Sequence, residues 1–126
     1  MKKKSKNAQY VDGFVLSVPK NRLAAYKRIA TKASEVWREH GAIDYFECVG
    51  NDLKVPVGVP FNRIAKTKAN EVVVFAWITY KSKAHRNQVN KKVMQDPRLA
   101  AMMGKEMPFD HKRMSYGGFK VLVANA

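Results

Sequence analysis

The chain has 126 residues, of which 46% are hydrophobic and 27% charged, a composition typical of one soluble globular domain. Its 24 lysines and arginines outnumber its 10 acidic residues and give a net charge of +14. Such a charge attracts polyanions nonspecifically but defines no particular site. The single cysteine, Cys48, excludes an internal disulfide and a cysteine-based zinc site, and it fits a reducing compartment.

The first residues, "MKKKSKNAQY", are basic, but no apolar segment follows them as in a secretory signal. No apolar run elsewhere approaches the ~20 residues that a membrane-spanning helix requires. We therefore expect a cytoplasmic protein with no membrane partner. Residues 1–9 are expected to form a basic, flexible tail, and residues 10–126 a single domain.

The first half of the domain predicts a strand, a helix and a second strand. "YVDGFVLSV" alternates as a strand does, and "AIDYFECVG" follows the same pattern. Between Asn21 and Gly41, apolar residues recur at steps of three and four, which predicts one helical stripe. Those residues are Leu23, Tyr26, Ala30, Ala33 and Trp37.

The second half begins with a loop at residues 51–70 that contains Pro56, Gly58 and Pro60, and we expect at most one short extended piece within it. "EVVVFAWITY" is the clearest strand of the chain. "SKAHRNQVNKKVMQ" predicts a helix with Ser82 as its N-cap, and Asp96-Pro97 ends that helix and begins a short turn, "PRLAAMM". A loop, "GKEMPFDHKR", leads to the last strand, "MSYGGFKVLV".

The predicted order is therefore βαββαβ. This order is that of the α+β, ferredoxin-like fold, in which an antiparallel four-stranded sheet carries two helices on one face.

Both sides of the predicted strands are apolar, although helices would cover only one. The strand at 71–80 sets Val72, Val74, Ala76, Ile78 and Tyr80 against Val73, Phe75, Trp77 and Thr79. One uncovered face of four short strands has an area of roughly 300 Å². Leaving this face exposed to water would lose on the order of 8 kcal/mol of hydrophobic stabilisation. That is a typical domain's whole stability. We therefore expect two copies to pack sheet against sheet as a homodimer.

One stretch, "SYGGFKVLV", is similar to half of an RNA-recognition signature. In such domains the aromatic, glycine-rich signature lies on the third strand of an open sheet. Here it lies on the fourth predicted strand. Gly117 and Gly118 instead indicate a bulge or a close approach of the backbone.

Four stretches together resemble the YbaA-like family of short bacterial proteins of unknown function. They are "YVDGFVLSVPKNRLAAYKR", "VWREHGAIDYFECVGND", "VVVFAWITYKSKAHRNQVNKKVMQDPRL" and "MPFDHKRMSYGGFKVLV". The resemblance covers roughly residues 10–123. It implies a ferredoxin-like protomer of the dimeric α+β barrel superfamily, which includes cofactor-free monooxygenases, heme-handling enzymes and small-ligand binders. The family itself brings no established activity or catalytic residues, and a fold alone does not define a function.

Glu47 is the candidate catalytic residue. In the second strand it shares a face with Ile43, Tyr45 and Val49. If that face is buried, the carboxylate needs a partner or acquires a raised pKa. It would then act as a general base, or it would form a structural ion pair with an arginine.

Candidate ligand-binding residues follow in the second half of the chain. Arg86 and Asn90 are four apart on one helix and share a face. With Trp77 and Tyr80 they would line a cleft between helix and sheet, where the arginine holds an anionic group and the rings form the wall. The alternative is that Arg86 bridges to Asp96 or Asp110 and that the rings belong to the core.

Asp110, Arg113 and Tyr116 cluster before and within the last strand, either as a network that fastens a loop or as a pocket rim. The three histidines, His40, His85 and His111, lack the spacing of metal ligands, so neither a metal nor a cofactor is expected. The alternative is that one of them ligates heme or acts as a base.

Two functional hypotheses follow from these patterns. In the first, the protein binds or transforms a small molecule beside the sheet. In the second, the basic tail and the basic second helix bind RNA or another nucleic acid, and the basic residues of that helix are Lys81, Lys83, Arg86, Lys91 and Lys92.

Overall fold

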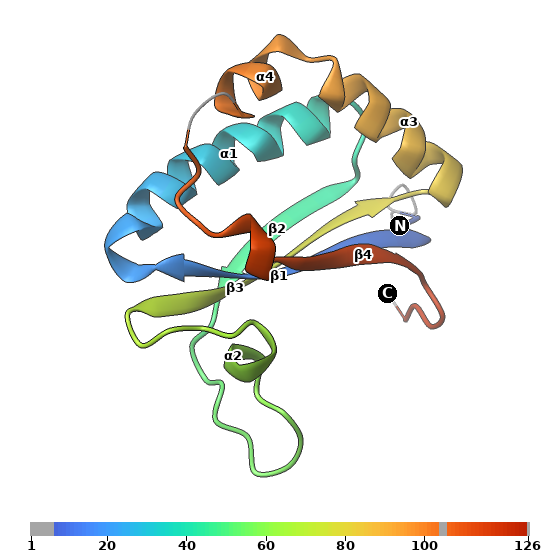
Figure 1. Ribbon diagram of the computed structural model, residues 1–126. Helices are drawn as coiled ribbons and strands as arrows, with labels where there is room; N and C mark the ends of the chain where they lie inside the picture. The colour runs from blue at the N-terminus through green and yellow to red at the C-terminus, as the bar shows by residue number, and fades with distance from the viewer. Residues whose placement is uncertain (1–6, 104–105, 126) are drawn as a thin grey trace, which may run out of the picture.

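The computed structural model describes residues 7–103 and 106–125 as four strands with helices on either side of them (Figure 1). The strands are β1 (Tyr10–Pro19), β2 (Asp44–Val49), β3 (Glu71–Tyr80) and β4 (Ser115–Lys120). The α-helices are α1 (Leu23–Glu39), α2 (Phe61–Ile64), α3 (Lys83–Met94) and α4 (Pro97–Met103), with 3₁₀ turns η1 (Lys20–Arg22) and η2 (His111–Arg113).

The four strands form one antiparallel sheet in the order β2-β3-β1-β4. The central pair, β1 and β3, is in register along its whole length, from Tyr10 opposite Tyr80 to Pro19 opposite Glu71. β3 is rich in β-branched and aromatic residues, which suit a pleated, buried strand. The α+β class and the antiparallel four-stranded sheet expected from the sequence are confirmed.

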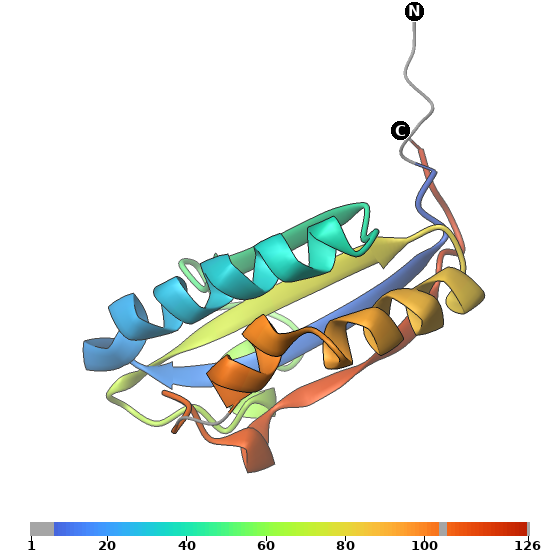
Figure 2. The ribbon, with the colours of Figure 1, turned by 90° about the horizontal axis from the view of Figure 1, so that it is seen from above.

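Helices α1, α3 and α4 cover one face of the sheet (Figure 1). Seen from above, α1 lies beside the pair α3 and α4 along the length of the sheet (Figure 2). The predicted stripe of α1 faces the sheet, with Tyr26, Ala33 and Val36 buried. Between these layers the core forms two clusters, one around Tyr80 and Val93 and one around Leu16 and Val74.

The predicted ends of α3 are confirmed at the level of hydrogen bonds. The Ser82 hydroxyl accepts a bond from the His85 amide at 3.0 Å. At the other end Asp96 accepts a bond from the Arg98 amide at 2.8 Å, which begins α4. The other oxygen of Asp96 lies 2.8 Å from Nε2 of His40, the residue that ends α1. Arg98 and His40 hold the pKa of Asp96 below its ordinary value by hydrogen bonding.

The structure corrects three details of the expected fold. A third helix, α4, lies on the helical face, where two were expected. The loop at 51–70 contains a short helix, α2, on the opposite side of the sheet, and Ser17 fastens it there through bonds to the Ala65 carbonyl (3.2 Å) and Thr67 hydroxyl (2.8 Å). Strand β4 ends at Lys120 rather than Val123.

The first six residues of the expected basic tail lie outside the described residues. Within the part of the chain that is described, no helix has the length and apolar character needed to cross a membrane.

The face of the sheet away from the three large helices carries exposed aromatic side chains. The Trp77 ring contacts Phe46 and Phe75, with centroid distances of 5.2 and 5.6 Å. Phe46 is 50% exposed and Phe75 is 43% exposed. The expectation that apolar side chains point both ways from the strands is therefore confirmed.

Candidate functional site

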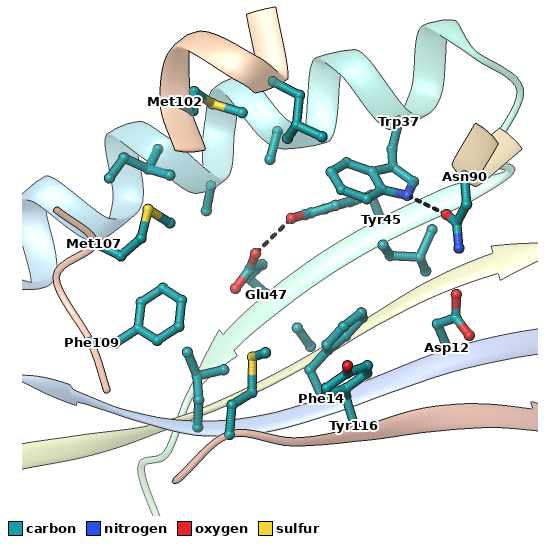
Figure 3. Close-up of a pocket in the computed structure, with 18 of the residues that line it drawn as sticks. Asp12, Phe14, Trp37, Tyr45, Glu47, Asn90, Met102, Met107, Phe109 and Tyr116 are labelled. Atoms are coloured by element: carbon teal, nitrogen blue, oxygen red, sulfur yellow. Dashed lines mark hydrogen bonds between the residues drawn. The ribbon is translucent and has the colours of Figure 1, made fainter. Parts of the chain in front are cut away.

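A cavity of about 370 Å³ lies between the helical layer and the sheet (Figure 3). Its volume falls within the range of pockets that hold small ligands, and most of its lining is apolar. Among the described residues it is lined by Asp12, Phe14, Leu16, Tyr26, Ile29, Ala30, Ala33, Trp37, Tyr45, Glu47, Ala76, Ile78, Arg86, Asn90, Met94, Leu99, Met102, Met107, Phe109, Met114, Tyr116, Gly117 and Gly118.

The sheet forms the floor of this cavity through residues that the strand register places in one row. Glu47 is paired with Ala76, Ala76 with Phe14, and Phe14 with Tyr116. The small side chain of Ala76 leaves space between the carboxylate on β2 and the aromatic pair on β1 and β4. Phe14 and Tyr116 stack at 5.9 Å between ring centroids.

Glu47 lies at one end of the cavity and is held by two tyrosine hydroxyls. Tyr26 of α1 donates to Oε1 at 2.5 Å, and Tyr45 of β2 donates to Oε2 at 2.7 Å. Burial, and after it the charge of Glu47, raises the pKa of both tyrosines, so both hydroxyls stay protonated. Within the described part of the chain no ion pair includes Glu47. The alternative of a structural ion pair with an arginine is therefore wrong.

Arg86 and Asp12 occupy the other end of the cavity. The guanidinium donates to the Tyr10 hydroxyl at 3.1 Å and lies over the Tyr10 ring, 5.2 Å from its centroid. Its Nε is 3.7 Å from the Asp12 carboxylate and is buried, with no hydrogen-bond partner among the described residues. Burial raises the pKa of Asp12, while Arg86 and a hydrogen bond from Tyr80 oppose that rise. Arg86 thus pairs with Asp12, and the expected bridge to Asp96 or Asp110 is wrong.

Gly118 makes room for Arg86 at this end. A Cβ on Gly118 would overlap the Tyr10 hydroxyl and would lie 2.9 Å from Nη2 of Arg86. The close backbone approach predicted for the glycine pair is therefore confirmed at Gly118. At Gly117 a Cβ would meet nothing within 4 Å.

Asn90 lies between the two ends and is oriented by its neighbours. Its side-chain oxygen accepts a bond from Nε1 of Trp37 at 3.2 Å and one from the Tyr80 hydroxyl at 3.5 Å (Figure 3). Tyr80 is fully buried and does not line the cavity, but its hydroxyl orients Asn90 through this hydrogen bond. Arg86 and Asn90 thus line the cavity, whereas the expectation that Tyr80 lines it with them is wrong, because the Tyr80 ring belongs to the core.

Trp77 is separated from the other candidate residues. It is three positions from Tyr80 on β3, so the two side chains project from opposite faces of the sheet. Trp77 lies instead with Phe46 and Phe75 on the outward face. The expectation that Trp77 lines the same cleft as Arg86 is therefore wrong.

Asp110 and Arg113 fasten a loop. Arg113 donates to both carboxylate oxygens of Glu71, at 2.8 and 2.7 Å, and to Asp110 at 3.1 Å. Hydrogen bonding to Arg113 lowers the pKa of Glu71 to about 2. Of this predicted group only Tyr116 lines the cavity.

Sequence reasoning missed the roof of the cavity and one of the residues that bind Glu47. Met102, Met107 and Phe109 form part of the roof, on α4 and the segment after it (Figure 3). Tyr26 was assigned to the helical stripe, where its spacing gives no sign that its hydroxyl reaches Glu47. The run of methionines between residues 94 and 114 was the available signal, because methionine lines adaptable apolar pockets. No three metal-ligating side chains gather anywhere in the described ranges.

The fold and cavity define an α+β protein in which an antiparallel sheet and helices line a largely apolar pocket. The chain belongs to the family described as "Protein of unknown function (DUF1428)", which matches residues 9–111. It is 44% identical over 115 residues to the "Uncharacterized protein YbaA" of Escherichia coli K12 and to that of Shigella flexneri, covering 91% of this chain and 97% of each relative. The resemblance to YbaA-like proteins is therefore confirmed.

The fold is similar to that of a NIPSNAP family protein of unknown function from Agrobacterium tumefaciens. The two chains superpose with a TM-score of 0.54 at 16% identity, over 92% of this chain and 90% of the other. This likeness concerns the fold alone.

Proposed function

We propose that this protein is a cytoplasmic homodimer that binds or transforms a small, largely apolar molecule in the cavity between its helices and its sheet. Each protomer is a ferredoxin-like domain, and two protomers form an α+β barrel through their outward sheet faces. Glu47 is the candidate proton acceptor, and Arg86, Asn90 and Tyr116 contribute to ligand contacts.

The observation that carries the proposal is the cavity itself. A domain interior is normally packed to the density of an organic crystal, with few voids larger than a water molecule. Here a pocket of about 370 Å³ that is partly open to solvent lies between the layers, and Asp12, Glu47 and Arg86 reach it. Large apolar cavities with a few convergent polar groups are where proteins bind small molecules.

The distribution of charge supports a second copy of the chain on the outward face. The chain carries a net charge of +14, yet the strand register places no lysine or arginine at an outward-facing strand position. Two positively charged protomers repel least where they meet through a face without lysine or arginine, and burial of Phe46, Phe75 and Trp77 supplies the attraction.

The same distribution weakens the nucleic-acid alternative. A single-strand platform combines aromatic rings with a positively charged groove. Here the exposed rings lie on the outward face, while the exposed Lys83, Lys91 and Lys92 lie on α3 across the sheet. RNA binding through the tail and α3 stays a prediction.

A pair of matched variants tests the cavity as the binding site. Ala30→Leu places a larger side chain into the cavity from α1, whereas Ala24→Leu makes the same change at an exposed position of that helix. Small aromatic probes should raise the melting temperature of the wild type and of Ala24→Leu, but not that of Ala30→Leu. Equal shifts in all three proteins would contradict binding in the cavity.

A further inference from the structure

We infer that the Glu47 end of the cavity binds the positively charged head of a small organic cation, an amine or a quaternary ammonium. The apolar body of that ligand would fill the rest of the cavity. The inference rests on the proposed function, since it names the chemical class of ligand for the same cavity.

Both oxygens of the Glu47 carboxylate are held by hydroxyl donors. Each of its oxygens accepts a bond from a tyrosine hydroxyl, from Tyr26 on one side and Tyr45 on the other. An oxygen of a carboxylate has two lone pairs, so each can still accept a bond from, or contact, a ligand.

The described chain supplies no counter-charge for this carboxylate. A second groove lies on the outer side of α1 and β2, and both Lys27 and Glu47 line it. No ion pair joins these two residues. Arg86 contacts Asp12 and Tyr10 of β1, close to Gly118 of β4. β4 is the edge strand at the opposite edge of the sheet from β2. Strands β2 and β4 are three strand spacings apart, a distance of roughly 14 Å across the sheet. A cationic ligand beside the Glu47 carboxylate would supply a charge attraction that no described side chain provides.

Aromatic rings surround the position where such a head would lie. Tyr26, Tyr45, Trp37 and Phe109 all line the same cavity, and Figure 3 shows Trp37, Tyr45 and Phe109 on the sides around Glu47. The Tyr26 and Phe109 rings pack edge to face with their centroids 5.8 Å apart, and the ring centroids of Trp37 and Tyr45 are 6.1 Å apart. The electron-rich faces of such rings attract ammonium groups, and quaternary ammonium sites in proteins use them in this way.

The overall charge of the chain acts in the opposite direction. A net charge of +14 repels cations at long range, so a preference for a cation would have to come from the local site. High salt screens the long-range repulsion between exposed charges but weakens contacts within a partly buried site much less. The test is therefore made at high salt.

The experiment compares benzyltrimethylammonium with neopentylbenzene, its neutral isostere with carbon in place of nitrogen. Dissociation constants are measured by NMR titration for the wild type, Glu47→Gln, and Glu35→Gln, which removes the same charge from an exposed position of α1. We expect the wild type and Glu35→Gln to bind the cation at least about tenfold more tightly than the isostere. Glu47→Gln should lose most of that preference; if it does not fold, Glu47→Asp, which withdraws the carboxylate by one methylene, should reduce it.

The outcomes separate this inference from the proposed function. If both probes bind equally well to the wild type, or if Glu47→Gln keeps the preference for the cation, the inference is overturned although the cavity binds ligands. If neither probe binds, or if Ala30→Leu leaves both affinities unchanged, the cavity is not the binding site. The proposed function and the inference are then both overturned.

Discussion

The hydroxyl of Tyr26 donates a 2.5 Å hydrogen bond to Oε1 of Glu47, which ties the first turn of α1 to the edge strand β2. Tyr45 binds the other oxygen of the same carboxylate. The site at this end of the cavity is therefore part of the packing of helix against sheet, so substitutions here should affect both stability and ligand binding.

Removal of the Tyr26 hydroxyl tests this link. Tyr26→Phe keeps the ring and deletes a bond to a charged group, which should lower the free energy of unfolding by about 1.5–3 kcal/mol. The measurement is urea denaturation near neutral pH. Tyr116→Phe is the control, since Tyr116 is 70% exposed and should change stability by less than about 0.5 kcal/mol. Equal effects of the two substitutions would show that the Tyr26–Glu47 bond does not stabilise the fold.

The adjacent glycines of β4 provide a second matched comparison. Gly118→Ala directs a methyl group at Tyr10 and Arg86, and the buried Tyr10 ring cannot swing away, so we expect a loss of about 1–2 kcal/mol in unfolding free energy. Gly117→Ala meets nothing within 4 Å and should be neutral or slightly stabilising. Thermal and urea unfolding of both variants measure the difference. A Gly118→Ala protein as stable as Gly117→Ala would refute the close approach.

Local sequence patterns predicted most of the fold. The strand at 71–80, the stripe of α1 and the Ser82 cap each depend on residues close together in the chain, and each is confirmed. The helix α2 was missed because a tertiary bond from Ser17 to Ala65 holds it, and no periodicity marks so short an element.

The candidate site was predicted only in part, because its contacts join distant segments. Glu47, Arg86 and Asn90 could be named from their faces and spacing. Their partners could not: Tyr26 is 21 residues from Glu47, and Tyr10 is 76 residues from Arg86. The prediction for Trp77 was wrong because side chains three positions apart on a strand, such as Trp77 and Tyr80, project from opposite faces of the sheet.

The pair of Arg113 and Glu71 predicts a pH dependence of stability. Hydrogen bonding to Arg113 lowers the pKa of Glu71 from its ordinary value of 4.5 to about 2. The folded state thus binds this proton less readily than the unfolded state, so the stabilisation is complete above about pH 4.5 and is lost as the pH falls towards 2.

Comparison of the wild type with Glu71→Gln isolates this contribution. We expect the wild type to have the larger unfolding free energy near neutral pH, and the gap to narrow steadily as the pH falls from about 4.5 to 2. Unfolding free energies from urea titrations across that range provide the measurement. A gap that stays constant with pH would show that the pKa of Glu71 is not lowered by folding.

The outward sheet face predicts the oligomeric state. Two chains of 14.3 kDa give 2 × 14.3 = 28.6 kDa, which sedimentation equilibrium should find for the wild type. Phe75→Arg places a charge among Phe46 and Trp77 and should weaken association by at least about a hundredfold, because an unpaired charge would be buried. Ala100→Arg, at an exposed position of α4, should remain a dimer. A monomeric wild type at micromolar concentration would contradict the proposed dimer.

The most direct test of the central claim is a methyl NMR spectrum recorded during titration with a small aromatic probe such as benzyltrimethylammonium. The chain has four isoleucines: Ile29 and Ile78 line the cavity, whereas Ile43 and Ile64 do not. Binding between the helices and the sheet predicts saturable shifts of the Ile29 and Ile78 methyl signals with little change at Ile43 and Ile64. Shifts confined to Ile43 or Ile64, or no saturable shift at all, would contradict it.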